Sequence, residues 1–238
     1  MRIEFPHFGG SQMREAGDNP KIKFSDGTSY AKTHCLVHKG RVFYYYLDEH
    51  CLVDAHAVRD FPTRASSVNM LYRIPAGHVR DPLVVFGAIS TIAREFGEGL
   101  PLSQPLEALM GRRLKAVDGS YAPTLPPPES REVDLTYVFP ERIVSAIREL
   151  VTRLADFAPS ILSREAMVYA PAVQWVMPRL KLDRHFAVPR AQRAWCIGDA
   201  TGTTAGVLPA AVSGIVAARD ALTQMKGGEI QDRIWGEL

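Results

Sequence analysis

The first third of the chain alternates between apolar and polar positions in the way that strands do. Four β-branched or aromatic runs cover residues 28–37, 40–47, 51–58 and 67–74, and turn residues such as "SDG", "HKG" and "DEH" separate them. A fifth run, "MRIEF", occupies residues 1–5. Runs of this kind are typical of half-buried strands. The pattern therefore predicts a largely antiparallel sheet in this region.

Two stretches carry apolar residues at helical spacing instead. One begins at Asp81-Pro82, where an aspartate can cap the helix and a proline fits its first turn. The other begins at Pro140. The apolar positions that recur every three or four residues are Val85, Ile89, Ile92 and Phe96 in the first, and Ile143, Val144, Ile147, Leu150, Val151 and Leu154 in the second. This spacing predicts two helices, and the stripe of the second makes it amphipathic.

The connecting segments are less regular. Residues 115–130 are rich in proline and polar residues, which predicts a surface connection or a mobile loop. Short apolar runs at 132–139, 167–176 and 194–197 are expected to be strands. Together these elements predict an α+β fold, in which a mixed or antiparallel sheet is accompanied by helices.

Composition narrows the functional classes. The 238 residues carry a net charge of +2, with no long basic run, so neither nucleic acid nor an anionic membrane is an expected partner. The longest weakly polar run is too short to span a bilayer, and the N-terminus has no signal-peptide pattern. The three cysteines are an odd number, as in reducing compartments. We therefore expect a cytoplasmic protein.

The segment from Ala194 to Leu222 has the strongest chemical character. It reads as a short apolar strand, a turn rich in glycine and threonine, and a helix of small residues, with Asp199 where the strand ends. A short acid at that position can accept hydrogen bonds from a sugar hydroxyl, and the helix N-terminus favours negative charge. The candidate cofactor-binding residues are Gly198, Asp199, Gly202, Thr203, Thr204, Gly206 and Val207.

One face of the same helix carries only small or weakly polar residues at spacings of three and four. These residues are Ala210, Ser213, Gly214, Ala217, Ala218 and Ala221. Such a stripe lets a flat ligand or another backbone approach closely. We expect it to be exposed here or to be covered by another chain. Spacing alone leaves open a strand-turn-helix without a cofactor.

"WCIGDATGTTAGVLPAAVSGIVAARDAL" resembles the C-terminal FAD-contacting motif of two-dinucleotide-binding-domain flavoproteins. Within that group the chain is most similar to the NAD(FAD)-utilizing dehydrogenases, and the resemblance extends to "VDLTYVFPERIVSAIREL", "REAMVYAPAVQW" and "AKTHCLVHKGRV". It implies that Asp199 binds the ribityl chain or the adjoining phosphate. It also implies that the backbone of Gly206 and Val207 faces the pyrimidine edge of the flavin. Ala205 departs from the family, whose members often carry arginine there.

The family's other FAD element is missing from the printed sequence. There is no G-x-G-x-x-G, the fingerprint that cradles the pyrophosphate. We therefore expect a partial, truncated flavoprotein, with a strand remnant of the FAD domain at 1–5, a substrate-binding-like domain at 6–190 and a Rossmann-like FAD segment at 191–238. Binding of FAD by this chain alone is in doubt. A partner chain with a G-x-G-x-x-G domain, or a homodimer, would complete the site.

Two functions follow from this picture. The first is a partial FAD-dependent oxidoreductase or dehydrogenase that acts on a small-molecule substrate of unknown identity. The alternative is a non-catalytic binding or assembly subunit, which docks on a partner that supplies the missing FAD-binding half. No catalytic residue is assigned from the sequence.

A separate cluster raises the question of zinc. Cys35, His38, Cys51 and His56 have roughly the spacing of a tetrahedral site. Both segments read as strands, however, so Cys35 and His38 would face opposite sides unless a turn intervenes. We favour ordinary buried cysteines and exposed histidines over a zinc site. A catalytic thiolate at Cys35, beside His34 or His38, is a further hypothesis that would require a lowered thiol pKa.

Overall fold

The computed structural model describes residues 1–7, 21–25, 27–58, 60–116, 121–174 and 179–226. Its contacts divide the chain into two compact units, Met1–Gln174 and Trp175–Leu238. The boundary predicted from the sequence lies later, after residue 190. Across the described residues the fold is α+β, with a mixed sheet and four α-helices. No helix in these ranges has the length and apolar character needed to cross a membrane.

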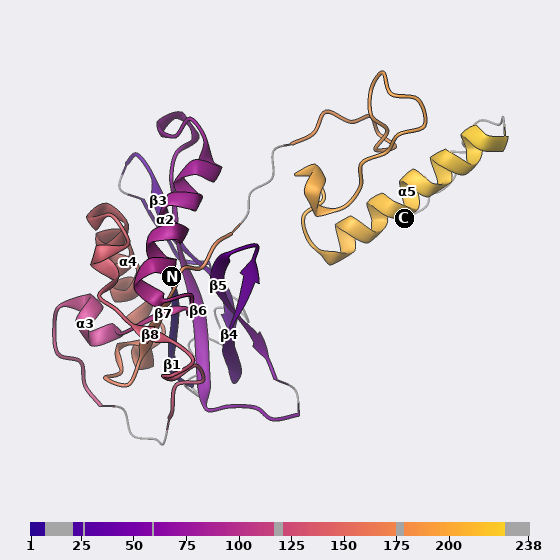
Figure 1. Cartoon of the computed structure of the whole chain (residues 1–238). Coiled ribbons are helices and arrows are strands. Elements are labelled where there is room, and N and C mark those ends of the chain that lie inside the picture. Colours follow the sequence, from indigo (N-terminus) through magenta and orange to yellow (C-terminus); the bar gives the residue numbers. More distant parts are fainter. Residues whose placement is uncertain (8–20, 26, 59, 117–120, 175–178, 227–238) are drawn as a thin grey trace. The chain divides into compact units, whose positions relative to one another are not determined.

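The first unit contains nearly all of the regular structure (Figure 1). Its strands are β1 (Arg2–Pro6), β2 (Lys23–Ser25), β3 (Tyr30–Val37), β4 (Gly40–Leu47), β5 (His50–Ala57), β6 (Ala65–Arg73), β7 (Leu102–Pro105), β8 (Arg131–Glu132) and β9 (Met167–Ala170). Its α-helices are α2 (Pro82–Gly97), α3 (Leu106–Met110) and α4 (Glu141–Ala155). Three short 3-10 helices are η1 (Ala76–His78), η2 (Leu135–Tyr137) and η3 (Pro159–Leu162).

A seven-stranded sheet organises this unit in the order β2-β3-β6-β1-β9-β7-β8. Every neighbouring pair is antiparallel except β7 and β8. The predicted antiparallel character is therefore confirmed. The strand expected to be a remnant of another domain, β1, lies at the centre of this sheet between β6 and β9. The strands β4 and β5 form a separate two-stranded hairpin, with Tyr44 opposite Val53.

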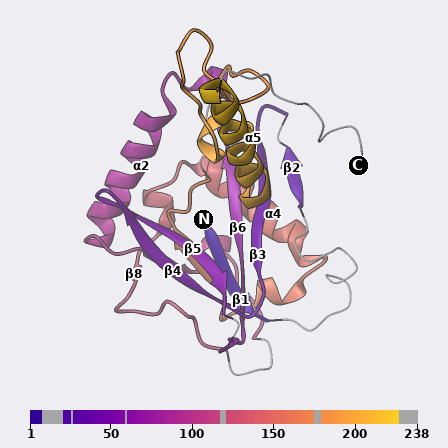
Figure 2. The same ribbon diagram turned by 90° about the vertical axis from the view of Figure 1, so that its right-hand side faces the viewer.

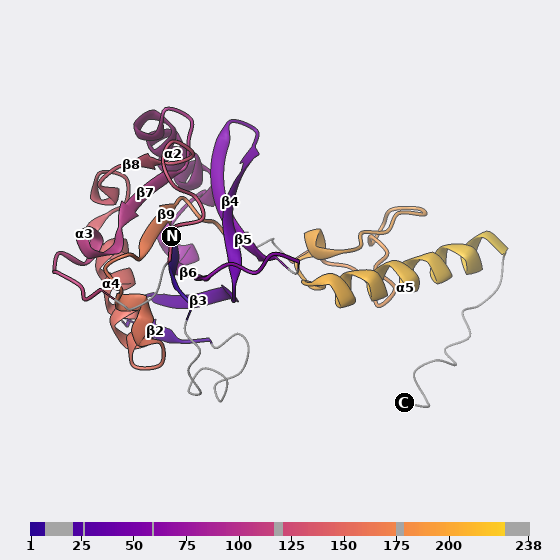
Figure 3. The same ribbon diagram turned by 90° about the horizontal axis from the view of Figure 1, so that it is seen from below.

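The sheet is the middle layer of the unit. Helices α3 and α4 lie on one side and the β4–β5 hairpin on the other, as Figures 2 and 3 show. Because successive strand residues face opposite sides, Ile3 and Phe5 of β1 enter the core on the α4 side. Ile147 and Leu150 of α4 meet them there, and both are fully buried. The two predicted helices are confirmed, and Asp81 caps α2 by accepting a hydrogen bond from the Leu83 amide at 2.9 Å. In α2 the buried residues are Ser90, Ala93 and Gly97, whereas Ile92 and Phe96 of the predicted apolar stripe are exposed.

The alternate residues of β1 are charged and buried on the hairpin side. The Arg2 guanidinium donates to Asp54 Oδ1 at 3.0 Å, to the Cys35 carbonyl at 3.1 Å and to Ser67 Oγ at 3.1 Å. Burial lowers the pKa of Arg2 to about 10. Each of the three guanidinium nitrogens thus has a partner, as a buried charge requires.

Glu4 lies two residues further along the same face. Its carboxylate accepts hydrogen bonds from the amide and the hydroxyl of Thr124, at 3.0 Å for the amide. Burial raises the pKa of this carboxyl, and the hydrogen bonds from Thr124 act in the opposite direction. Thr124 and the buried Leu125 belong to the segment predicted as a surface connection. That prediction is wrong for these residues, because they cover Glu4 and pack beside Val42.

Two predicted strands have another conformation. Residues 132–139 form the end of β8 and then the 3-10 helix η2, because Asp134 caps the Thr136 amide at 2.9 Å and turns the chain. Residues 194–197 form no strand, only an isolated bridge between Trp195 and Ala187. A short apolar run becomes a strand only where a neighbouring strand can pair with it.

Candidate functional site

The second unit contains the predicted cofactor-binding residues. Its regular elements are the 3-10 helix η4 (Asp199–Thr201) and the helix α5 (Val207–Lys226), which Figure 1 shows in orange and yellow. Residues 179–198 form loops against one side of α5. The predicted strand before the turn is replaced by this loop. The predicted helix after it is confirmed.

Hydroxyl groups hold the turn between η4 and α5 in one conformation. The hydroxyls of Thr201 and Thr204 both donate to the Gly198 carbonyl, at 2.8 and 2.7 Å. The Thr201 hydroxyl also lies 2.9 Å from that of Thr203. The threonine side chains therefore bind the turn itself. Thr201 is fully buried, and the sequence analysis did not single it out.

Three glycines place the turn in conformations that other residues rarely adopt. Gly198, Gly202 and Gly206 have φ values of 80°, 69° and 102°. A Cβ atom at Gly198 would meet no atom within 4 Å, so the backbone there is open to an approaching group. These φ values explain why glycine stands at the three positions. Their role in binding a cofactor stays a prediction.

Asp199 is the exposed acid of this turn. Its backbone carbonyl accepts from the Gly202 amide at 3.0 Å, while its carboxylate has no hydrogen bond or ion pair with any described residue. Gly206 and Val207 follow at the start of α5, where Val207 is 91% exposed. The first amides of a helix have no partner within it. An acceptor and a set of donors thus point outward from one short turn.

The stripe of small residues on α5 is covered by the unit's own loop. Ser213 is fully buried and its hydroxyl accepts from the Gly198 amide at 2.9 Å. A Cβ atom at Gly214 would lie 3.7 Å from Ile197. Ala217 is also buried, whereas Ala218 is exposed. The expectation that this stripe lies exposed, or beneath another chain, is therefore wrong for its central residues, because the preceding loop occupies it.

A buried acid that the sequence analysis missed fixes the loop to the helix. Asp220 of α5 is 4% exposed and accepts from the Trp195 indole at 2.7 Å. It also accepts from the Gln224 amide at 2.9 Å and lies 3.6 Å from His185 Nδ1. The sequence did contain a signal for this residue, because Asp220 lies three residues after Ala217 and so falls on the same helix face as the small-residue stripe. Its role is to position the loop that precedes Gly198.

The predicted zinc ligands do not come together. Cys35 lies in an irregular part of β3, His38 follows that strand, and Cys51 and His56 lie on β5. Among the described residues, no group of three or more histidine, cysteine or acidic side chains could hold a metal ion. Burial raises the pKa of Cys51 to about 11, which is unlike a thiolate ligand. The catalytic hypothesis for Cys35 stays a prediction.

Comparison of the whole chain with protein-family models and with curated proteins finds no match.

Proposed function

We propose that the chain is part of an FAD-dependent oxidoreductase, in which it contributes a substrate-binding-like region and the last FAD-contacting segment. The observation that carries this proposal is the turn from Gly198 to Val207. It offers one carboxylate acceptor that has no partner among the described residues, and the amides of a helix N-terminus. These are the two groups that a polyhydroxylated chain joined to an electron-rich ring would need.

The residues present fit one half of that cofactor. Asp199 would accept a hydrogen bond from a ribityl hydroxyl, and the amides at Val207 and Leu208 would donate to a carbonyl oxygen of the ring. The positive end of α5 would favour negative charge on that oxygen. When bound, FAD supplies hydride acceptance; the chain's residues hold and orient it.

The other half of the cofactor has no counterpart in this sequence, because no G-x-G-x-x-G is present. We propose that a partner chain with such a domain, or a second copy of this chain, contributes the missing groups. The proposal leaves the small-molecule substrate unassigned.

A second candidate function is a non-catalytic subunit that docks on that partner. The observation in its favour is the apolar side of α5 that the loop leaves uncovered. Val207, Leu208 and Met225 are 91, 74 and 73% exposed, and Ile215 and Leu222 are exposed as well. Apolar groups gathered on one helix are a feature of docking surfaces.

Titration of the purified full chain with FAD, followed by flavin fluorescence and absorbance, tests the first proposal. We expect saturable binding that weakens by about tenfold in Asp199→Ala, since a charged hydrogen bond contributes this order of free energy. Asp48→Asn is the matched control, because it removes one exposed charge from the β4–β5 turn.

If FAD binds equally well to Asp199→Ala, the turn is not the flavin site. If the wild-type chain binds no FAD, alone or with a G-x-G-x-x-G partner, the first function fails. Stable association with such a partner in the absence of FAD would then support the docking function.

A further inference from the structure

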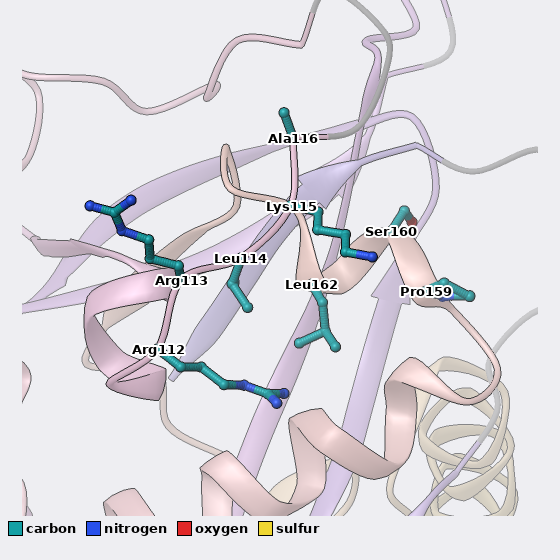
Figure 4. A pocket seen from close by; sticks show the side chains of 8 residues that line it. All are labelled: Arg112, Arg113, Leu114, Lys115, Ala116, Pro159, Ser160 and Leu162. Atoms are coloured by element: carbon teal, nitrogen blue, oxygen red, sulfur yellow. The ribbon is translucent and has the colours of Figure 1, made fainter.

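An open depression in the first unit is lined by cationic and apolar side chains. It has a volume of about 560 Å³ and lies between the segment after α3 and the 3-10 helix η3. Figure 4 shows the lining residues, which are Arg112, Arg113, Leu114, Lys115, Ala116, Pro159, Ser160 and Leu162. Depressions of this volume accommodate small organic molecules. Its position in the first unit makes it independent of the turn around Asp199.

Among the described residues, the cations of this depression have no acidic partners. The side chains of Arg112, Arg113 and Lys115 form neither ion pairs nor hydrogen bonds with other residues that the structure describes. Two acids flank this segment in the sequence: Asp118, which lies outside the described residues, and Glu107, which accepts a hydrogen bond from the Leu114 amide at 2.7 Å. Among the described residues, positive charge is therefore in excess along this wall, although the Glu107 carboxylate lies beside Leu114.

The orientation of the three side chains differs. In Figure 4, Arg112 and Lys115 extend toward Leu162 and Ser160, whereas Arg113 extends in the opposite direction. Ser160 adds a polar group to this side, since its hydroxyl oxygen is buried and has no hydrogen-bond partner among the described residues. In this view Arg112 and Lys115 lie on either side of the Leu162 side chain, and the unsatisfied Ser160 hydroxyl lies on the Lys115 side.

The backbone that carries these groups is fixed on both sides. Lys115 pairs with Ser163 in a parallel bridge, and its carbonyl accepts from the Arg164 amide at 2.9 Å. The Ser163 amide in turn donates to the Ser160 carbonyl at 3.1 Å. Backbone hydrogen bonds therefore join the two walls of the depression, and they fix the backbone from which the cationic side chains extend.

We infer that this depression binds a small organic phosphate, a phosphate monoester with an apolar body. The guanidinium of Arg112 and the ammonium of Lys115 would hold the dianionic head, and the Ser160 hydroxyl would donate a third hydrogen bond. Leu114, Pro159 and Leu162 would contact the apolar body. A dianion is attracted to two cations more strongly than a monoanionic carboxylate is.

The test is a titration of the ¹⁵N-labelled full chain with phenyl phosphate at low ionic strength. We expect saturable amide shifts in both 112–116 and 159–162. Phenylacetate and inorganic phosphate should bind more weakly, because each lacks part of the recognised chemistry, and benzyl alcohol should not saturate. Arg112→Gln and Lys115→Gln should each weaken binding by about tenfold, the order expected for loss of a charge-assisted hydrogen bond.

The neighbouring arginine provides the matched control. Arg113→Gln removes the same charge one residue away, and Arg80→Gln removes it outside the depression; both should stay within about twofold of wild type. Since all four side chains are exposed, the variants should keep the wild-type spectrum elsewhere.

Three results would overturn the inference. These are the absence of saturation by phenyl phosphate in the wild-type chain, equal losses in Arg112→Gln and Arg113→Gln, and phenylacetate binding as tight as that of phenyl phosphate. Without saturation there is no binding site. Equal losses in the two arginine variants would indicate a diffuse charge effect, and equally tight phenylacetate binding would contradict the assignment of a phosphate. If a variant misfolds, the salt dependence of wild-type binding decides: affinity that is insensitive to salt contradicts a cationic site.

Discussion

The two units of the chain are stabilised by different kinds of interaction. In the first, α4 and the sheet enclose a core of fully buried aliphatic side chains, such as Ile3, Ile147 and Leu150. In the second, Ala217 is the one buried apolar residue among residues 179–226, and the buried groups beside it are the polar Thr201, Ser213 and Asp220. Hydrogen bonds between buried polar groups therefore stabilise the second unit, whereas burial of apolar side chains stabilises the first.

This difference has a consequence for the candidate sites. A large apolar core tolerates the loss of a surface contact, because the stability it provides is spread over many side chains. A small unit held by a few buried polar groups depends on each of them, since an unsatisfied buried donor is costly. The turn around Asp199 belongs to the second kind of structure, and the cationic depression belongs to the first.

The largest effect is expected from the core of the first unit. Leu150→Ala removes a fully buried side chain of α4 and should lower the free energy of unfolding by about 3 kcal/mol, through lost burial and the cavity that remains. Urea denaturation measures this loss. Thr152→Ala, on the exposed side of the same helix, should change it by less than about 0.5 kcal/mol. Similar losses in both variants would contradict the position assigned to the core.

An effect confined to the second unit is expected from Asp220. Asp220→Ala leaves the Trp195 indole without its acceptor and should destabilise the loop by about 1 to 3 kcal/mol. Hydrogen exchange read by mass spectrometry should speed up within 179–226 and remain unchanged within the first unit. Asp199→Ala should leave exchange unaltered, because that carboxylate has no protein partner among the described residues. Faster exchange throughout the first unit would show that the two units do not unfold separately.

A smaller effect is expected from Glu4, whose titration should make the free energy of unfolding depend on pH. Burial raises the pKa of this carboxyl above its ordinary value of 4.5, so the folded chain holds the proton more tightly than the unfolded chain does. Its contribution to stability is complete below pH 4.5 and is lost as the pH rises through the raised value. Glu4→Gln cannot lose a proton and should flatten this part of the stability profile.

Thermal unfolding at a series of pH values measures that slope. Glu129→Gln removes an exposed carboxyl and should keep the wild-type slope. Equal slopes in wild type and Glu4→Gln would show that Glu4 stays charged in the folded chain despite its burial.

Local sequence patterns predicted the regular elements well where each element has a neighbouring element to pack against. Asp81-Pro82 begins α2 as expected, and the spacing around Ile147 identified the buried face of α4. The alternating runs became β3, β4, β5 and β6. In α4 the periodicity of the apolar side chains matches the buried face, so the pattern and the packing require the same conformation. In α2 it does not, because Ile92 and Phe96 are exposed.

The patterns failed where an apolar run had no strand beside it. Residues 194–197 are short and apolar, but their indole binds Asp220 and their Ile197 packs beside Gly214 of the following helix. For the candidate turn, the sequence identified its glycines and its acid. It could not show that the threonine hydroxyls of the turn are occupied by the Gly198 carbonyl.

The sequence by itself determined the α+β character, the antiparallel pairing of the early strands and the chemical types gathered at the Gly198–Val207 turn, because these depend on residues close together in the chain. Only the tertiary structure decided that β1 is central, that Thr124 covers Glu4, and that Arg112 and Lys115 line one depression with Ser160. Such contacts join segments far apart in sequence, and their geometry follows from the packing of the whole unit rather than from any local pattern.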